Sequence, residues 1–185
     1  PQGATIGTSS LRRTALLKVR RPDLNIVPLR GNVQTRLAKL KEGGMQATML
    51  AKAGLNRLGL HDIEGAVLPV EDFLPAVGQG AIGIECRDGD EEVRLALAAI
   101  AHELTKLSVT CERAFLRVLD GSCRTPIGGY AHVEHGQILF NGIIAKPDGS
   151  LSHKVSSFGD FLDAEEVGKR AGEELLIKAG GNFLA

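Results

Sequence analysis

An α/β unit is encoded by the run Ala4-Thr-Ile-Gly-Thr-Ser-Ser-Leu-Arg-Arg-Thr-Ala-Leu-Leu-Lys-Val-Arg-Arg-Pro-Asp-Leu-Asn-Ile-Val-Pro-Leu29. Residues 4–7 and 24–29 are short segments rich in apolar and β-branched side chains, which predicts two strands. The hydroxyl groups at positions 8–10 can cap a helix that continues to about Arg21, where the following Pro-Asp pair stops it. The run therefore predicts a strand, a helix and a second strand with short connections.

The same alternation continues along the first half of the chain. Asn32 can cap a helix over about residues 33–42, which the Gly43-Gly44 pair terminates. Residues 47–51 predict a further strand, followed by a short helix at about 54–58. Alternating strands and helices with short connections form a parallel sheet that binds ligands at the carboxyl ends of its strands. We therefore expect residues 1–77 to form an α/β domain.

The pattern changes after residue 66. The glycine-rich run Leu74-Pro-Ala-Val-Gly-Gln-Gly80 predicts a hinge. Residues 81–86 predict a strand, and residues 91–101 predict a polar helix after the Asp88-Gly-Asp90 turn. We expect residues 78–101 to link the two halves of the chain.

The last part of the chain predicts a small α+β domain over residues 102–185. After a break near 102–105, the apolar spacing indicates a helix over residues 108–119. An antiparallel three-stranded meander and a closing amphipathic helix follow. The expected strands lie near 130–133, 137–145 and 150–156, and the helix covers residues 164–179.

Composition argues against several classes of function. The 185 residues carry 22 basic and 22 acidic side chains, a balance that argues against a general nucleic-acid or membrane-surface binder. Trp is absent and aromatic residues make up 4%, which disfavours base stacking. No apolar run is long enough to span a membrane and no signal-peptide pattern is present, so we expect a cytoplasmic protein. Because the sequence starts at Pro1 rather than Met, we expect it to be part of a longer protein.

The cysteines have neither disulfide-framework nor metal-ligand spacing, which is typical of a reducing compartment. Cys86 and Cys111 lie within strand and helix patterns, so we expect both thiols to be buried and structural. Cys123 lies on a short loop before Pro126 and beside Arg124, whose charge favours the reactive thiolate. A small buried residue at a helix-loop corner is the alternative interpretation of Cys123.

Arginines follow the expected strands of the first half at their carboxyl ends. They are Arg12, Arg13, Arg30, Arg36 and Arg57. Because a helix N-terminus is already positive, several guanidinium groups there indicate a polyanionic ligand. Solvated surface arginines are the alternative for any single member. No Gly-x-Gly-x-x-Gly or Walker lysine pattern accompanies them, so a small molecule with several carboxylates fits better than a nucleotide.

Five motifs occur in order along the chain. They are Gly7-Thr-Ser-Ser-Leu-Arg-Arg13, Leu29-Arg-Gly-Asn-Val-Gln-Thr-Arg36, Leu50-Ala-Lys-Ala-Gly-Leu-Asn-Arg-Leu58, Leu74-Pro-Ala-Val-Gly-Gln-Gly-Ala81 and Gly121-Ser-Cys-Arg-Thr-Pro126. Together they closely resemble the porphobilinogen deaminase family of tetrapyrrole biosynthesis, over essentially the whole chain. The resemblance implies a transferase that joins four porphobilinogen units head to tail, with loss of ammonia, to give hydroxymethylbilane. It also implies that the α/β half is similar to half of a periplasmic binding protein.

In this family the loop cysteine is joined by a thioether to a dipyrromethane cofactor, which primes the successive couplings. The resemblance therefore implies that Cys123 carries the dipyrromethane, and that no metal is involved. The same five arginines would neutralise the acetate and propionate groups of the cofactor and growing chain, whose charge must be paired when desolvated. Hydrogen bonds around the pyrroles would come from Thr8, Ser10, Asn32, Ala51, Gly54 and Gln79.

The chain departs from the family at its start. Family members carry an N-terminal lobe that contributes the catalytic aspartate, so we assign no catalytic residue here and expect the chain alone to be inactive. Residues 78–101 belong to that lobe in the family, and the strand expected at 81–86 would lose its sheet partners. Although the family is typically monomeric, we expect this strand to pair with another copy, to reorganise or to become disordered. Gln46 replaces a common acidic residue and Ser122 a common glycine; we expect both to be tolerated.

Two other hypotheses remain open at the level of sequence. The chain could be a non-enzymatic module for multi-carboxylate small molecules, or a regulatory or degraded fragment without a ligand. His102, His132 and His135 lack metal-site or triad spacing, so we expect them in turns or on the surface. Glu85 and Asp88 end a strand before a Gly-Asp turn, which favours solvated side chains over an acid–base pair.

Overall fold

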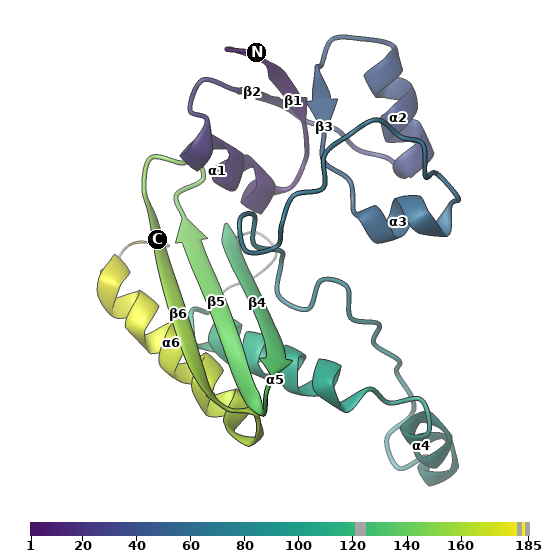
Figure 1. Cartoon of the computed structure of the whole chain (residues 1–185), viewed down its shortest axis with the longest axis vertical. Helices are drawn as coiled ribbons and strands as arrows, with labels where there is room; N and C mark the ends of the chain where they lie inside the picture. Colours follow the sequence, from purple (N-terminus) through teal and green to yellow (C-terminus); the bar gives the residue numbers. More distant parts are fainter. Residues whose placement is uncertain (121–124, 181–182, 184–185) are drawn as a thin grey trace.

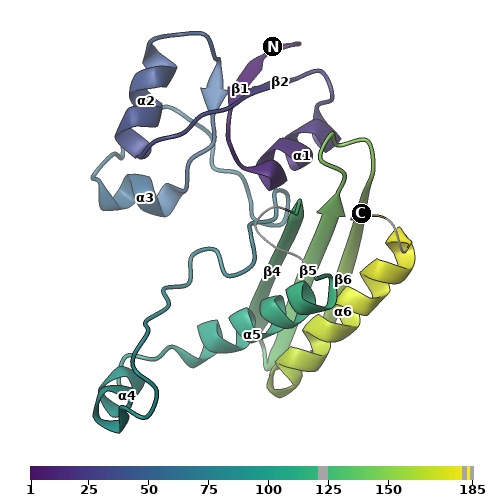
Figure 2. The same ribbon diagram turned by 180° about the vertical axis from the view of Figure 1, so that it is seen from behind.

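The chain folds into a small parallel sheet with helices, followed by an antiparallel sheet backed by two long helices (Figure 1). The computed structural model describes residues 1–120, 125–180 and 183. Within these residues, every helix is too short or too polar to cross a membrane. A long extended segment separates the two sheets in sequence and carries a short helix at its far end (Figure 2).

The first sheet is parallel, with β1 (Thr5–Gly7) between β2 (Asn25–Val27) and β3 (Ala47–Thr48). Helices α1 (Leu11–Arg20), α2 (Val33–Lys41) and α3 (Lys52–Arg57) each follow one of these strands. The predicted alternation is confirmed. Strand β3 is shorter than expected, and α3 begins earlier than residue 54.

The predicted helix caps are also confirmed. The Ser10 hydroxyl accepts a hydrogen bond from the Arg13 backbone N–H at 3.3 Å, and the Asn32 side chain accepts one from Thr35 N–H at 2.8 Å. Each bond satisfies a backbone donor that the first helical turn leaves free. These caps fix where α1 and α2 start relative to the ends of β1 and β2.

The second sheet is the predicted antiparallel meander, in the order β4 (Ile127–Glu134), β5 (Gln137–Ala145), β6 (Ser152–Asp160). Helix α5 (Glu103–Val118) precedes it, and a 3-10 turn η1 (Phe161–Asp163) leads into α6 (Ala164–Ala179). The break expected near 102–105 is wrong. His102 Nδ1 accepts from Thr105 N–H at 3.2 Å, so the imidazole caps α5 and the helix begins five residues earlier than expected.

The main core lies between this sheet and the helix pair α5 and α6, which cover one of its faces (Figure 1). Phe115 of α5 and Phe140 of β5 are fully buried with ring centroids 4.7 Å apart. The two helices approach closely because Gly168 of α6 faces the backbone of α5: a Cβ there would lie 2.0 Å from Cys111 O. Cys111 is buried as expected, and burial with the neighbouring Glu112 raises the pKa of its thiol to about 12.

The strand expected at residues 81–86 is not formed. This segment is extended and exposed, with Ile82 at 82% and Ile84 at 57% exposure, and it runs to α4 (Glu91–Ala98), which lies apart from both sheets (Figure 2). Cys86 is exposed, so the expectation of a buried thiol there is wrong. The physical reason is shared: a strand needs a neighbour to take up its backbone hydrogen bonds, and among the described residues none lies beside this segment.

The run predicted as a hinge is packed against both halves. Phe73 and Leu74 are buried in an apolar cluster with Leu16 of α1 and Ile143 of β5. Pro75 O accepts a hydrogen bond from Gly129 N–H of β4 at 3.0 Å. The segment therefore connects the α/β half to the meander through specific contacts.

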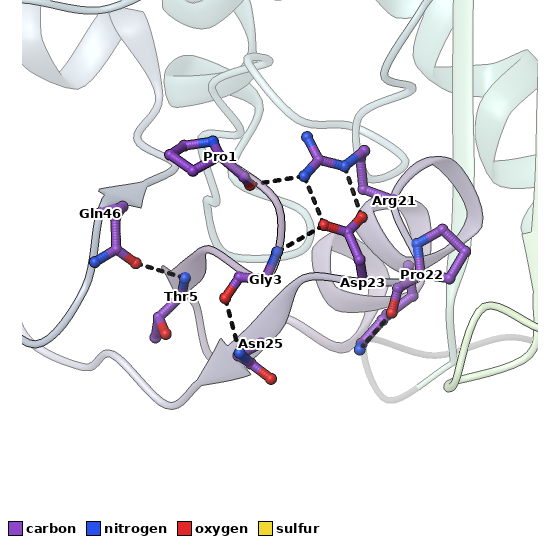
Figure 3. A network of polar contacts seen from close by, with 9 residues as sticks. Pro1, Gly3, Thr5, Arg21, Pro22, Asp23, Asn25 and Gln46 are labelled. Carbon is purple, nitrogen blue, oxygen red and sulfur yellow. Dashed lines mark hydrogen bonds and ion pairs between the residues drawn. The ribbon is translucent and has the colours of Figure 1, made fainter.

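A polar network fixes the first residues at the amino end of the parallel sheet (Figure 3). The Asp23 carboxylate accepts from Gly3 N–H at 2.9 Å and from Arg21 Nε at 2.7 Å. The Arg21 side chain and the Gly3 amide hold the pKa of Asp23 well below its usual range. Gln46 Oε1 accepts from Thr5 N–H at 2.7 Å, so the amide oxygen at this position provides the acceptor that a carboxylate would.

Candidate functional site

The polar residues predicted for the site lie on the three connections that leave the parallel sheet. Thr8 and Ser10 follow β1, Asn32 follows β2, and Ala51 follows β3. Since the strands are parallel, these connections meet at the same edge. Thr8 is buried and its hydroxyl accepts from Ser10 N–H at 3.2 Å, which shapes the turn into α1.

Arg12 lies in the first turn of α1, only 8% exposed. Its Nη1 donates to Leu74 O at 2.6 Å, and its Nη2 donates to Gln79 Oε1 at 3.1 Å. Burial, together with the charge of Arg13, lowers the pKa of Arg12 to about 10. The fold thus holds a desolvated cation in place by neutral acceptors.

Arg13 and Arg36 extend this positive cluster. Arg13 Nη1 donates to Met49 O at 2.7 Å, and Arg36 Nε donates to Gly31 O at 2.8 Å. Burial and the nearby charge of Arg36 lower the pKa of Arg13. Within the described parts of the chain, none of Arg12, Arg13 and Arg36 forms an ion pair with a carboxylate. We name Arg12, Arg13 and Arg36 the arginine cluster.

The structure does not bring every predicted residue into this cluster. Arg30 is exposed on the second connection and Arg57 is exposed at the last residue of α3, and in the described residues neither side chain shares a hydrogen-bond partner with the arginine cluster. Gly54 lies inside α3, where an added Cβ would meet Val33 only at an ordinary 3.7 Å. Gln79 contributes by holding Arg12. Cys123 lies outside the described residues, as do Ser122 and Arg124.

The expectation of turn or surface positions holds for His102 and His135, which are exposed, but His132 is half-buried and its Nδ1 is buried without a hydrogen-bond partner among the described residues. His135 lies in the β4–β5 turn with φ of 49°, and His132 lies half-buried on β4, stacked on Tyr130 with ring centroids 5.6 Å apart. Among the described residues, no group of three or more histidine, cysteine or acidic side chains could hold a metal ion.

One buried polar residue was missed by the sequence reasoning. Glu112 lies in the middle of α5, and its carboxylate accepts from Gly78 N–H at 2.6 Å and from Ala131 N–H at 2.9 Å. Burial raises the pKa of Glu112, although the two backbone bonds act in the opposite direction. The available signal was its spacing, because Glu112 lies three residues before Phe115 and seven before Leu119, on the face of α5 that is buried.

Chemically, the arginine cluster is suited to an anion with several charges. Burial and the charge of a neighbouring arginine lower the pKa of Arg12 and of Arg13, and the cluster lies at the edge of the sheet where ligands bind in parallel α/β folds. An anion bridging them would relieve this repulsion and would pair guanidinium groups that burial has partly dehydrated. The flat, forked guanidinium geometry matches carboxylates and phosphates.

Comparisons with known proteins identify the chain's relatives. Residues 1–95 match the family model described as "Porphobilinogen deaminase, dipyromethane cofactor binding domain", and residues 106–177 match "Porphobilinogen deaminase, C-terminal domain". The chain is 50% identical over 187 residues to "Porphobilinogen deaminase, chloroplastic" from Pisum sativum, and the match covers 99% of this chain and 51% of that protein. The chain therefore spans about half the length of this curated relative. These matches, made independently over both halves of the fold, show that the chain belongs to the porphobilinogen deaminase family.

Proposed function

We propose that the chain is part of a transferase of tetrapyrrole biosynthesis, which condenses four porphobilinogen units with loss of ammonia to give hydroxymethylbilane. The observation that carries the proposal is the arginine cluster, whose cations lie together without a carboxylate partner in the described residues. Each pyrrole unit of such a product carries two carboxylates. The family match supplies the chemical identity of the anion.

The arginine cluster fits a dipyrromethane cofactor. Its donors are guanidinium groups, which suit the acetate and propionate side chains of linked pyrroles. We propose that Cys123 binds the cofactor through a thioether, while Arg12, Arg13 and Arg36, joined by Arg30 and Arg57, bind its carboxylates and those of the growing chain. When bound, the cofactor supplies the terminal pyrrole to which the next porphobilinogen unit is joined.

The residues of the chain would have distinct tasks around this ligand. The arginine cluster neutralises charge that accumulates as each unit adds two carboxylates. Thr8, Ser10 and Asn32 set the positions of the helix starts, so that backbone N–H groups at these turns face the same edge. A covalent anchor on the Cys123 loop would keep the primer in place through repeated couplings, which makes each coupling a local event.

We expect this chain alone to bind without completing the reaction. In the family, the aspartate that handles the pyrrole nitrogen protons belongs to the N-terminal lobe, and we assign its role to no residue of this chain. The strand order β2-β1-β3 supports the proposal that the first half is similar to half of a periplasmic binding protein. Family membership disfavours the alternative of a non-enzymatic multi-carboxylate binder. The pea relative is named as chloroplastic, so a plastid competes with the cytoplasm as the compartment.

The proposal is tested by calorimetric titration of the chain with porphobilinogen. Replacing Arg13→Gln removes a charge-assisted contact, so we expect roughly tenfold weaker binding or more. Lys41→Gln is the matched control, because Lys41 is an exposed cation in the last turn of α2. Equal affinity in the wild type and the Arg13 variant would overturn the proposed role of the cluster, as would a wild-type chain that does not bind.

A further inference from the structure

Glu112 is a buried carboxylate that serves two segments from different parts of the chain. It is 6% exposed and lies between the buried residues Cys111 and Phe115 along α5. One carboxylate oxygen accepts from Gly78 in the glycine-rich run, and the other accepts from Ala131 in β4. Among the described residues, no cation lies within ion-pair distance of it.

Such a group is unfavourable for stability by itself. A carboxylate buried without a paired cation loses its hydration, and two backbone bonds replace this only in part. Glu112 offsets this cost by accepting hydrogen bonds from two backbone N–H groups that would otherwise have no partner. β4 is an edge strand, and its outward N–H groups are taken up by Pro75 O at Gly129 and by Glu112 at Ala131.

The hydrogen bond to Gly78 connects Glu112 to the arginine cluster, because residues on either side of Gly78 hold Arg12. Gly78 lies in a turn closed by a Gln79 N–H to Ala76 O bond of 3.0 Å. The two groups that hold the Arg12 guanidinium, Leu74 O and Gln79 Oε1, belong to the same short run. Fixing Gly78 therefore fixes Gln79, its neighbour in the chain, and restrains Leu74 through the three residues between them.

We propose that Glu112 is a positioning residue for Arg12: by holding the 74–79 run against α5 and β4, it sets the guanidinium at the ligand-binding edge of the parallel sheet. α5 is also the helix that leads to the Cys123 loop. Glu112 thus links the helix that precedes the anchor to the cation that binds the ligand. The proposal that Glu112 positions Arg12 does not depend on a ligand, whereas the effect of this position on pyrrole binding rests on the proposed function.

The placement is tested by NMR of the Arg12 side chain in the free 185-residue chain. In the wild type, the two held Nη groups should give separate signals that broaden little, because rotation of the guanidinium is restricted. In Glu112→Gln, the amide NH2 faces one of the two backbone N–H donors, so one bond is lost and the Arg12 signals should merge. Val167→Ala, a core change in α6 away from the run, serves as the control for lowered stability.

Unchanged Arg12 signals in Glu112→Gln would overturn the proposal, and so would an equal change in Val167→Ala. If Glu112→Gln does not fold, hydrogen exchange of the wild type decides: Gly78 N–H should be as protected as Ala131 N–H, and rapid exchange at Gly78 would contradict the proposal.

A second readout measures the consequence for binding. Porphobilinogen should bind Glu112→Gln about three- to tenfold more weakly than the wild type. In an Arg12→Ala background the same change should have little further effect, because the two residues act through one contact. Additive losses would contradict a role exerted through Arg12. If porphobilinogen does not bind the wild type, the proposed function fails, while the Arg12 signals still decide the placement.

Discussion

At the scale of single residues, the site depends on cations whose burial lowers the stability of the fold. Arg12 is buried, it neighbours Arg13, and the acceptors that hold it are neutral. Burying a charge without a counter-charge lowers stability, so binding of an anion at this edge is favoured. A ligand carboxylate would complete the pairing that the protein leaves open. Under the proposed function, this would be the physical basis for binding a substrate whose charge grows with each added unit.

Asp23 provides a residue-scale prediction at the opposite end of the sheet. Its pKa is depressed in the folded chain, so its stabilising contribution is present above the ordinary pKa of 3.8 and is lost as the pH falls through the folded pKa. Asp23→Asn should therefore lower the melting temperature at neutral pH. The gap to the wild type should shrink as the pH falls below the ordinary aspartate range.

Melting curves at a series of pH values measure this. Asp62→Asn is the control, because Asp62 is exposed in the irregular stretch that follows α3. A gap that is constant or widens in acid would contradict the depressed pKa of Asp23.

At the scale of elements, α5 and α6 pack at a glycine contact that positions α5, the helix that precedes Cys123 in the sequence. The added Cβ of Gly168→Ala would lie 2.0 Å from Cys111 O, and backbone atoms there cannot move aside cheaply. The helices would have to separate, so we expect a loss of about 2 kcal/mol or more in the free energy of unfolding, despite the higher helix propensity of alanine. Chemical denaturation measures it, with exposed Glu173→Ala as the control. A stability equal to that of the control would show that α6 shifts without cost.

The elements also show how far the sequence could be interpreted. The caps at Ser10 and Asn32 and the helix at 164–179 were predicted correctly, because their signals are local: a side-chain acceptor, an apolar stripe, a terminating glycine. The segment 81–86 was predicted wrongly because strand formation depends on a partner strand, which a single-strand pattern does not contain.

Some residues of the candidate site could likewise be predicted from the sequence, and others could not. Parallel topology was enough to predict that Thr8, Asn32 and Arg12 follow strands at one edge of the sheet. It was not enough to separate Arg12, Arg13 and Arg36 from Arg30 and Arg57, which are exposed, because that depends on side-chain burial. Glu112 was missed because its two partners are backbone N–H groups 34 and 19 residues away in sequence.

At the scale of the whole molecule, the two halves meet through the run at 73–79, whereas residues 81–101 extend away from both (Figure 2). Ile82 and Ile84 alternate along an extended, exposed backbone, a pattern that favours pairing with another strand. We propose that two copies of the chain associate through residues 81–86.

Sedimentation velocity at increasing concentration tests this association. The wild type should shift towards a dimer, and Ile84→Lys should remain monomeric because the charge opposes burial of the pairing face. Leu162→Lys changes another exposed apolar residue, in the 3-10 turn η1, and serves as the control. A wild-type monomer at all concentrations would contradict the association, as would a dimer that only Leu162→Lys disrupts.

We propose that this fold binds linked, carboxylated pyrroles through Cys123 and the arginine cluster. The decisive measurement is the intact mass of the chain purified from cells whose own porphobilinogen deaminase supplies linked pyrroles, so that the chain has only to attach them. The mass should increase by two linked pyrrole units, with no such increase in Cys123→Ser. An unmodified wild-type chain, or an adduct that persists in Cys123→Ser, would contradict it.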